Sequence, residues 1–427
     1  MNNPMKYQIL FATMAIFLSS CTHNGSAKAE SPYSTEKYTF IEEWLSQPVD
    51  HTDAKSSTFE QQIFIIVPKN ASPDSPVFFI LGNEIDLTKR WLLHAYKSYG
   101  EPDNVIFIAA EHRGYGQSIT MDKNQTLPSY ITINQTLADF HNVATFYNKK
   151  YTGSWIAAGY SYGGGLSINY AYKYPNDAKV VLSSSGAVDY PLITDKWDRK
   201  LHIYYGEDFY NRLAKHINYF KPKSLFDEDW INREFLSDMC AVIPQKQHSH
   251  KYKNLLKVVS YLPTSAFLNV TIWLERKLNS GKGLQLIYSK TKKKLSREEA
   301  LTGNFSLRTW RYQQCTETGH FFNSVNINGI FPSRSFQGVS KECESLFGKK
   351  IVVSSNTQWS PRSMLNKLTI PIIYVNGVKD PTDGMLEQNY QIQNGQYINI
   401  SDGRHCPDLS NSKVGEKVLA TLLTYTI

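Results

Sequence analysis

The sequence lacks several features that would mark other classes of protein. Charged residues make up only 20% of the 427, which excludes a disordered polyelectrolyte. The net charge of +8 is spread along the chain and is not gathered into a basic arm, so it does not indicate nucleic-acid binding. No apolar run after the N-terminus approaches the roughly 18 residues that a membrane-spanning helix needs. The composition is that of a globular protein.

Cysteine is also scarce, with five in the chain. No C-x-x-C motif occurs, so the sequence supports neither a zinc ribbon nor a redox pair. His248 and His250 lack an evident third ligand nearby, which favours a solvated loop over a metal site. We therefore expect no metal and no cofactor.

The N-terminus carries an export signal. Lys6 precedes an uncharged apolar run over 9–18, whose ten residues would rise only about 15 Å as a helix, too short to cross a bilayer. The run ends in Leu18-Ser19-Ser20-Cys21, which resembles a bacterial lipobox. We therefore predict a lipoprotein signal peptide over 1–21, a lipid on Cys21 that anchors the chain to the outer membrane, and a tether over 22–40.

A second cleavage site offers an alternative to lipidation. Ala27-Lys28-Ala29 matches the A-x-A pattern, and cleavage there would release the protein into the periplasm or the medium. Either route exports the chain to an oxidising compartment, where disulfides form.

The remaining sequence alternates short β-rich runs with segments of helical length, a pattern typical of a parallel sheet covered on both faces. The apolar runs lie at 62–67, 76–81, 104–110, 155–158 and 179–182, and the helical segments at 132–149 and 162–174. From about residue 190 the pattern changes to helix-like pieces, at 208–219, 254–262 and 265–278. Strands return at 370–376 and 396–400, followed by a helix near 413–424.

A sheet that is interrupted by a mostly helical insertion and then resumed is typical of an α/β-hydrolase fold with a helical cap. We predict a hydrolase core over 41–189 and 366–427 and a cap domain over 190–365.

A nucleophile is predicted at Ser161. The motif Gly159-Tyr160-Ser161-Tyr162-Gly163 follows a strand and opens a helix, which is the context that a nucleophile elbow requires. The turn is so tight that its neighbouring positions must be small, and it holds the serine at the top of the sheet.

The partners of the serine follow in the chain order Ser, Asp, His that this fold uses. Asp380 and His405 come just after predicted strands, at the sheet edge where Ser161 stands. His405 would take the serine proton, and Asp380 would orient the imidazole and stabilise its charged form. The nearest alternatives are Asp383 for the acid and His320 for the base.

An oxyanion hole needs two backbone donors aimed at the developing charge. One is expected to be the N–H of Tyr162, directly after the nucleophile. The other is expected to be the N–H of Asn83, in the Gly82-Asn83-Glu84 loop after a strand.

Motifs spread over residues 47–409 resemble those of the serine peptidase family S28. They are Q-P-V-D-H at 47–51 with T-F-E-Q at 58–61, G-N-E at 82–84, E-H-R-G-Y-G-Q-S at 111–118, Q-T-L-A-D-F at 135–140, G-Y-S-Y at 159–162, W-R-Y-Q-Q-C-T-E at 310–317, N-G with D-P at 376–381, and H-C-P-D-L at 405–409. Two positions depart from the family pattern: Tyr160 replaces a glycine, and Thr382 replaces an aromatic residue.

The resemblance implies an exopeptidase that cleaves after proline. A proline ring needs an aromatic-lined slot, for which Trp310 and Tyr312, with Phe321 and Phe322 nearby, are candidates. Glu84 and Glu317 could hold a substrate ammonium group, and Arg113 could hold a carboxylate or pair with Glu111. Tyr160 is a further candidate for substrate contact.

In the family, the cysteine of the W-x-Y-Q-x-C motif pairs with one about thirty residues later, which corresponds here to Cys315–Cys343. Elimination then leaves Cys240–Cys406. The expected partners are peptide substrates and a membrane through the lipid anchor, without nucleic acid, and a homodimer is allowed. The rival interpretations are a lipase or esterase on the same fold and an inactive surface lipoprotein that binds peptides.

Overall fold

The computed structural model describes residues 33–118, 130–223, 228–246, 248–278, 306–348 and 360–427. The predicted signal peptide, Cys21 and the alternative cleavage site therefore lie outside the described residues. Among the described residues, no helix is long and apolar enough to cross a membrane.

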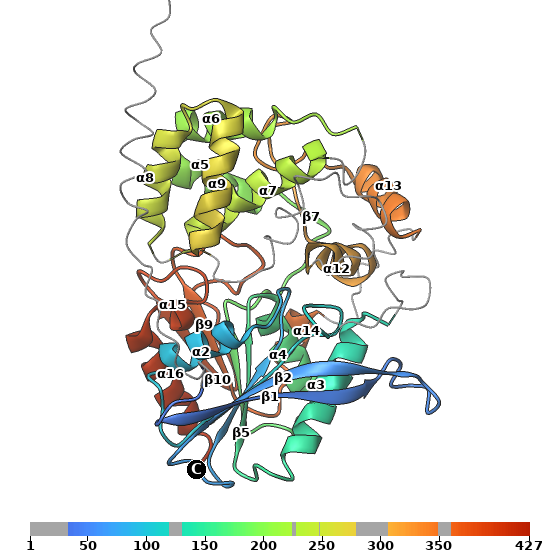
Figure 1. Ribbon diagram of the computed structural model, residues 1–427, viewed down its shortest axis with the longest axis vertical. Coiled ribbons are helices and arrows are strands. Elements are labelled where there is room, and N and C mark those ends of the chain that lie inside the picture. The colour runs from blue at the N-terminus through green and yellow to red at the C-terminus, as the bar shows by residue number, and fades with distance from the viewer. Residues whose placement is uncertain (1–32, 119–129, 224–227, 247, 279–305, 349–359) are drawn as a thin grey trace, which may run out of the picture.

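An eight-stranded sheet forms the lower half of the molecule (Figure 1). Its order is β1-β2-β4-β3-β5-β6-β9-β10, with β1 and β2 antiparallel to their neighbours and the other strands parallel. The strands are β1 (Tyr38–Pro48), β2 (Thr58–Pro68), β3 (Val77–Leu81), β4 (Ile106–Ala110), β5 (Trp155–Tyr160), β6 (Val180–Ser184), β9 (Ile372–Gly377) and β10 (Gly395–Ile400).

Helices cover both faces of this sheet. One face carries α2 (Lys89–Ser98), α15 (Pro407–Ser410) and α16 (Ser412–Leu423), and the other carries α3 (Ile133–Tyr147), α4 (Tyr162–Lys173) and α14 (Pro361–Leu365). Alternate residues of β3 point to opposite faces of the sheet: Phe78 packs on the α2 side and Phe79 on the α3 side. Such strands are apolar throughout because both faces are buried, which is why the sequence shows them as continuous runs.

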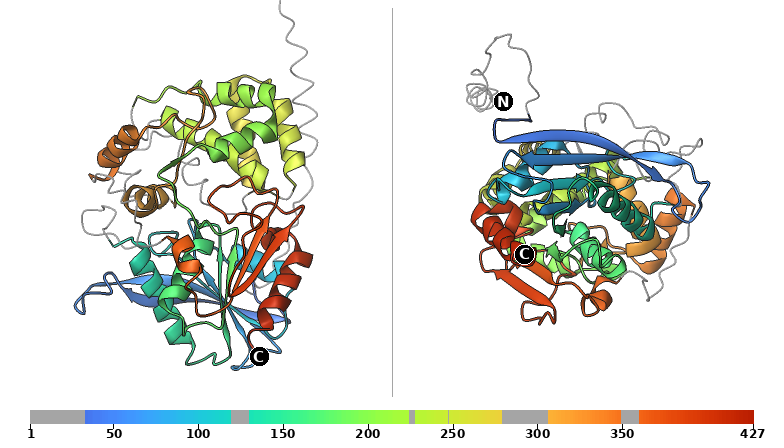
Figure 2. Two further views of the ribbon diagram at one scale, coloured as in Figure 1. Left: turned by 180° about the vertical axis from the view of Figure 1, so that it is seen from behind. Right: turned by 90° about the horizontal axis from the view of Figure 1, so that it is seen from below.

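The first strand was not predicted. β1 begins at Tyr38, inside the segment that we assigned to the tether, and pairs along its whole length with β2. The right-hand view of Figure 2 shows this pair along one edge of the molecule. As an edge strand, β1 leaves much of its length accessible to solvent, including Glu42 and Glu43, so it lacks the apolar run of a central strand.

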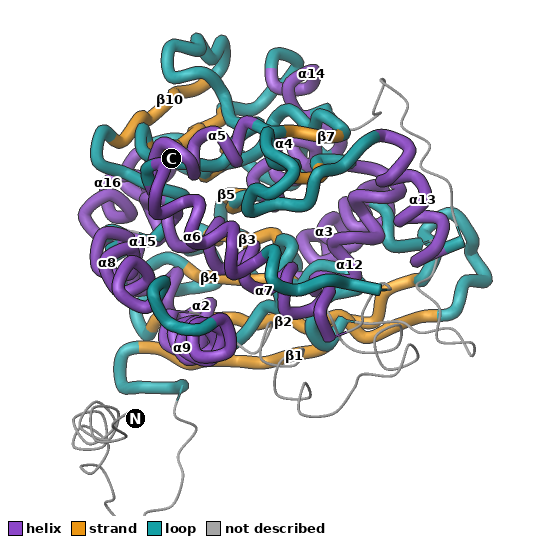
Figure 3. The backbone as a smooth tube through the Cα atoms, turned by 90° about the horizontal axis from the view of Figure 1, so that it is seen from above, coloured by secondary structure: helices purple, strands orange, loops and turns teal. Residues whose placement is uncertain are grey.

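The insertion forms a cap above the sheet. Its helices are α5 (Lys196–Tyr205), α6 (Glu207–Ile217), α7 (Glu228–Val242), η1 (Ile243–Gln245), α8 (Ser249–Val259), α9 (Thr264–Leu278), α12 (Ser306–Gln313), a π-helical turn η2 (Gln314–Thr318) and α13 (Phe336–Phe347). Seen from above, α5, α6, α7 and α9 lie over the strands (Figure 3). The cap has its own apolar core, which includes Leu201, Leu213 and Phe235.

Two details of the insertion differ from prediction. His250 lies in α8 and not in a loop. α14, which we placed in the cap, packs on α4, and its Met364 and Leu365 join the apolar cluster of Ile372. The hydrolase core therefore resumes before residue 366.

A disulfide joins Cys315 and Cys343, as the family resemblance implies. It ties η2 to α13 across a sequence separation of 28 residues. In the chain-entropy treatment, closing a loop of this length stabilises the fold by about 3–4 kcal/mol.

The second predicted disulfide is wrong. Cys240 and Cys406 are both buried free thiols. Cys240 belongs to the apolar core of the cap, whereas Cys406 packs in the core below the sheet edge and its Sγ lies 3.7 Å from the Ser184 carbonyl oxygen. The two side chains serve different cores and cannot meet without moving one of them.

The short strands β7 (Ile193–Thr194) and β8 (Phe321–Phe322) pair in a small second sheet. This pairing brings the start of the insertion beside the turn that follows η2. In the left-hand view of Figure 2, which shows the molecule from behind, the green part of the chain passes from the sheet up into the cap.

Candidate active site

Ser161 occupies a strained turn between β5 and α4. Its φ of 56° lies in the left-handed region, which is uncommon for a residue other than glycine. A Cβ at position 159 would lie 1.9 Å from the Gly163 carbonyl oxygen, so only glycine fits there. The sequence forms this turn because both flanking positions of the motif are glycines.

His405 and Asp380 meet at the same edge of the sheet. His405 Nδ1 lies 2.8 Å from Asp380 Oδ2, and their side chains are 13% and 1% exposed. Asp380 follows β9 and His405 follows β10, so parallel neighbouring strands deliver both groups to one place.

The electrostatics of this pair favour an ion pair. Burial works against the charge on Asp380, yet the neighbouring His405 and the hydrogen bonds from Thr382 lower its pKa. Burial likewise opposes the charged imidazole, but the Asp380 carboxylate outweighs it and raises the pKa of His405 well above its ordinary value. The pair therefore stabilises the imidazolium that forms when a histidine accepts a proton.

Thr382, one of the two departures from the family pattern, directly supports the acid. Its hydroxyl donates to Asp380 Oδ1 over 2.6 Å, and its backbone N–H donates to the same oxygen over 3.0 Å. The sequence marked this position as unusual but gave no sign that the hydroxyl would orient the carboxylate.

Buried hydrogen bonds fix the loop that carries His405. Asp408 is fully buried and accepts hydrogen bonds from the Tyr99 hydroxyl over 2.6 Å and from the Ser184 hydroxyl. Ser185 Oγ donates to Asn376 Oδ1 and accepts from the Cys406 N–H. The serines at 184 and 185, the N-G motif and the H-C-P-D-L motif thus join the ends of β6, β9 and β10, which positions His405.

The candidate oxyanion donors lie on adjoining turns. Tyr162 opens α4, so its N–H has no partner within the helix, and the Glu84 carboxyl group contacts it. A Cβ at Gly163 would come within 3.0 Å of Asn83 Cβ, which brings the 82–84 loop against the nucleophile turn.

Glu84 lies directly beside the nucleophile. Burial raises the pKa of its carboxyl group, and contacts with the Ser161 side chain and the Tyr162 backbone lower it in part. Its Oε2 is buried and has no hydrogen-bond partner among the described residues. A buried carboxylate oxygen without a partner is costly and suits a site that receives a donor from a ligand.

A polar network joins the cap to the nucleophile helix. Gln313 Nε2 donates to the Tyr162 hydroxyl over 2.8 Å, while Gln313 Oε1 accepts from the Tyr115 hydroxyl over 2.5 Å. Trp310, one turn earlier in α12, packs on the Tyr162 ring with centroids 5.0 Å apart. The W-x-Y-Q motif therefore contacts the residue after the nucleophile, although sequence reasoning did not single out Gln313.

Glu317 is a helix cap as well as an acid near the site. Its Oε2 accepts the N–H of Ile133, the first residue of α3, over 2.8 Å. Burial raises its pKa to about 7. One oxygen of Glu317 is thus already engaged by a backbone N–H.

Tyr160 and Tyr312 do not lie where a substrate could contact them. Tyr160 is 2% exposed and points into the core on the α2 side, where its hydroxyl lies 2.8 Å from that of Tyr99. Tyr312 is also buried and packs edge-on against Phe347 in the cap. Both predictions are wrong because alternate residues of a strand or helix point to different sides.

Arg113 is not available for a substrate carboxylate, nor does it pair with Glu111. It is fully buried, and two of its nitrogens donate to Asp139 over 2.6 Å each. Its remaining donors reach the carbonyl oxygens of Pro48, Val49 and Tyr130. The matched motifs around 47–51, 113 and 139 therefore hold the β1–β2 pair to the core.

Glu111 organises the loop near the site instead. It accepts hydrogen bonds from the N–H groups of Leu87, Gln117 and Ser118, each over 2.9 Å. A Cβ at Gly116 would lie 1.7 Å from Glu111 Oε1, which accounts for the glycine there.

The alternative acid and base pair with each other. His320 Nε2 lies 3.3 Å from Asp383 Oδ1, and both side chains are buried. Asp383 also accepts the Thr194 hydroxyl over 2.5 Å. Asp380 is thus the carboxylate that contacts His405, and Asp383 and His320 form a second, separate pair.

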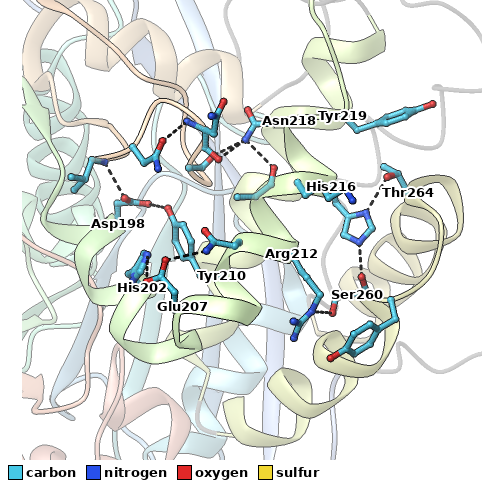
Figure 4. Close-up of a pocket in the computed structure, with 18 of the residues that line it drawn as sticks. Asp198, His202, Glu207, Tyr210, Arg212, His216, Asn218, Tyr219, Ser260 and Thr264 are labelled. Atoms are coloured by element: carbon cyan, nitrogen blue, oxygen red, sulfur yellow. Dashed lines mark hydrogen bonds and ion pairs between the residues drawn. The ribbon is translucent and has the colours of Figure 1, made fainter.

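A separate cavity of about 1230 Å³ lies within the cap (Figure 4). It is lined by α5, α6 and the segment 260–264, and contains none of Ser161, Asp380 and His405. Its polar groups are largely paired within the cap: His216 contacts the Thr264 hydroxyl and the Ser260 carbonyl oxygen, and the Tyr210 hydroxyl donates to Asp198. We therefore place the candidate site at the sheet edge and not in this cavity.

The parallel sheet with its two antiparallel edge strands, its strained serine turn and its His–Asp pair define an α/β-hydrolase of the serine type. The sequence model of the family described as Serine carboxypeptidase S28 matches residues 47–199 and 193–419. The chain belongs to this family and is a serine peptidase.

Relatives align over most of the chain. A protein described as probable serine protease EDA2 from Arabidopsis thaliana is 25% identical over 93% of this chain and 88% of its own length. The lysosomal Pro-X carboxypeptidase of Homo sapiens is 23% identical over 86% of this chain and 82% of its own length. Among solved structures, a proline iminopeptidase from Mycobacterium smegmatis covers 90% of this chain and 99% of its own, at 14% identity and a TM-score of 0.43.

Proposed function

We propose that the protein is an exported exopeptidase that cleaves after proline and releases X-Pro dipeptides from the N-terminus of peptides. The observation that carries the chemistry is the 2.8 Å contact between His405 Nδ1 and Asp380 Oδ2, at the sheet edge where Ser161 occupies its strained turn. Family membership supports the choice of a peptide over an ester as substrate.

The reaction proceeds through an acyl-enzyme. Ser161 Oγ attacks the scissile carbonyl carbon while His405 Nε2 takes the hydroxyl proton. The N–H groups of Tyr162 and Asn83 stabilise the oxyanion, and His405 then protonates the leaving amine. Water, deprotonated by the same histidine, hydrolyses the ester and frees Ser161.

The N-terminal direction rests on charge. Glu84 presents a buried, unpartnered carboxylate oxygen beside Ser161, which suits an ammonium group. Arg113, the cation considered for a carboxylate, is buried and saturated by Asp139 and backbone carbonyls. Relatives described as Pro-X carboxypeptidases favour a second candidate, a carboxypeptidase that removes the residue after a penultimate proline.

The proline slot draws on the aromatic residues that remain beside the nucleophile. Trp310 is partly exposed and packs on Tyr162, whereas Phe321 is fully buried in the cap with the disulfide. A small slot of this kind discriminates by about 1–3 kcal/mol per methylene, so proline should be preferred and alanine next.

A panel of five substrates tests the function. We expect rapid release of a chromophore from free Ala-Pro, slower release from Ala-Ala, and little hydrolysis of a short-chain nitrophenyl ester. Acetylating Ala-Pro should lower kcat/KM by about 100-fold, because the buried carboxylate of Glu84 loses its partner. Equal turnover of both forms, with rapid loss of the last residue from a peptide ending in Pro-Phe, would favour the carboxypeptidase. Preference for the ester would favour a lipase or esterase. Inactivity on every substrate of the panel would favour a protein that only binds peptides.

We further propose that export ends in lipidation at Cys21. The Cys315–Cys343 disulfide supports an oxidising compartment. The substitution Cys21→Ser should move the protein from the membrane fraction to the soluble fraction, which immunoblotting of fractionated cells will measure. A wild type that is wholly soluble, with Glu30 as its first residue, would contradict lipidation and favour cleavage after Ala29.

A further inference from the structure

Besides Asp383 Oδ1, which lies 3.3 Å from His320 Nε2, three buried polar atoms around the candidate site have no hydrogen-bond partner among the described residues: Glu84 Oε2, the Tyr190 hydroxyl and His320 Nδ1. Native structures leave few such atoms, because an unpaired buried polar group costs free energy. Because these atoms lie around the candidate site, they suit a ligand with matching donors.

The three groups are neighbours. The His320 and Tyr190 rings meet edge to face with centroids 5.7 Å apart. Burial, and after it the nearby Glu84 carboxylate, raises the pKa of Tyr190, so the hydroxyl and the carboxylate lie within electrostatic reach. Glu84 in turn contacts Ser161.

The structure fixes which nitrogen of His320 faces outward from its acid. Nε2 lies 3.3 Å from Asp383 Oδ1, and Nδ1 has no partner, so the tautomer with its proton on Nε2 directs that proton to the acid and presents the Nδ1 lone pair as an acceptor. Asp383 is itself fixed by the Thr194 hydroxyl. The backbone of His320 has a φ of 64°, an outlier of the kind that clusters at binding sites.

We propose that Tyr190 and His320 complete, together with Glu84, a pocket that binds the free α-ammonium group of the substrate. An ammonium group carries three donors, and this pocket supplies a carboxylate oxygen, a phenol oxygen and an imidazole nitrogen as three acceptors. The inference rests on the proposed N-terminal direction and assigns to the His320–Asp383 pair a role in substrate recognition rather than in proton transfer.

Conservative variants test the pocket. Tyr190→Phe removes only the hydroxyl. His320→Gln keeps a polar group near Nε2 but removes the acceptor at Nδ1, whereas His320→Asn keeps a group near Nδ1. Tyr151→Phe is the matched control, because the Tyr151 hydroxyl is also buried without a partner but packs beside Tyr147 in the cluster under α3, away from these groups.

We expect Tyr190→Phe and His320→Gln each to raise KM for a free Ala-Pro reporter by about tenfold, the loss of one hydrogen bond to a charged group, with kcat unchanged. Turnover of the acetylated reporter should not change, and Tyr151→Phe should behave as the wild type. His320→Asn should lie closer to the wild type than His320→Gln does. Unchanged ratios of free to acetylated turnover in both variants would overturn the pocket.

Binding separates this inference from the proposed function. In a Ser161→Ala background, calorimetry should show that acetylation weakens binding of the dipeptide Ala-Pro, and that Tyr190→Phe and His320→Gln remove most of that difference. Absence of turnover of every proline reporter by the wild type would contradict the proposed function alone. If acetylation weakens binding of the dipeptide but Tyr190→Phe and His320→Gln leave that difference unchanged, the inference is overturned while the proposed function stands.

Discussion

Replacing Ser161 by alanine is expected to lower kcat for a proline reporter by about 10⁵–10⁶-fold, because the attacking oxygen is lost and only binding and the oxyanion donors remain. Labelling by a fluorophosphonate should disappear with it. The fold should persist, since the strained turn is held by its backbone: the Ser161 N–H donates to the Ser184 carbonyl oxygen over 3.0 Å, and the flanking glycines are unchanged. Circular dichroism and the thermal midpoint check this.

Ser363→Ala supplies the control. Ser363 is an exposed serine in α14, so its loss should change neither labelling nor turnover. Undiminished labelling of the Ser161 variant would contradict the assignment of the nucleophile.

The parts of the site that could be predicted from sequence are those fixed by local geometry. A glycine two residues before Ser161 is required because any Cβ there would meet the Gly163 carbonyl oxygen, so the motif carries the turn with it. The central strands are buried on both faces and read as apolar runs, and the loops after them deliver Asp380 and His405. Chain order alone then relates the three residues.

The parts that failed depend on contacts between distant segments. Arg113 precedes Asp139 by 26 positions, and nothing in either motif indicates that they pair. Tyr160 and Ser161 are adjacent, yet the strand sends Tyr160 into the opposite layer, beside Tyr99. Cys240 and Cys406 were paired by elimination, but each is enclosed by a different apolar core, which no count of cysteines can show. The His320–Asp383 pair likewise joins the cap to the loop after β9, two segments that are far apart in the sequence.

Replacing Asp380 by asparagine is expected to lower kcat by about 10⁴-fold while leaving Ser161 and His405 in place. An amide keeps the shape of the side chain and can still accept from Thr382, but it cannot offset a positive charge on the imidazole. The imidazolium that forms when His405 accepts the serine proton is then less stable, so His405 is a weaker base. The imidazole also loses the acceptor that holds its proton on Nδ1 in one tautomer.

The pH at which kcat/KM falls is expected to shift in a defined direction in that variant. His405 works as a base only when neutral, and Asp380 raises its pKa, so wild-type kcat/KM should fall as the pH drops through a value well above 6.5. Removing the carboxylate lowers the pKa of His405, so the residual activity of Asp380→Asn should persist to lower pH than that of the wild type. Asp383→Asn is the control, because Asp383 contacts His320: it should raise KM for the free amine and leave kcat within about threefold. A large loss of kcat in Asp383→Asn with full activity in Asp380→Asn would exchange the roles of the two acids.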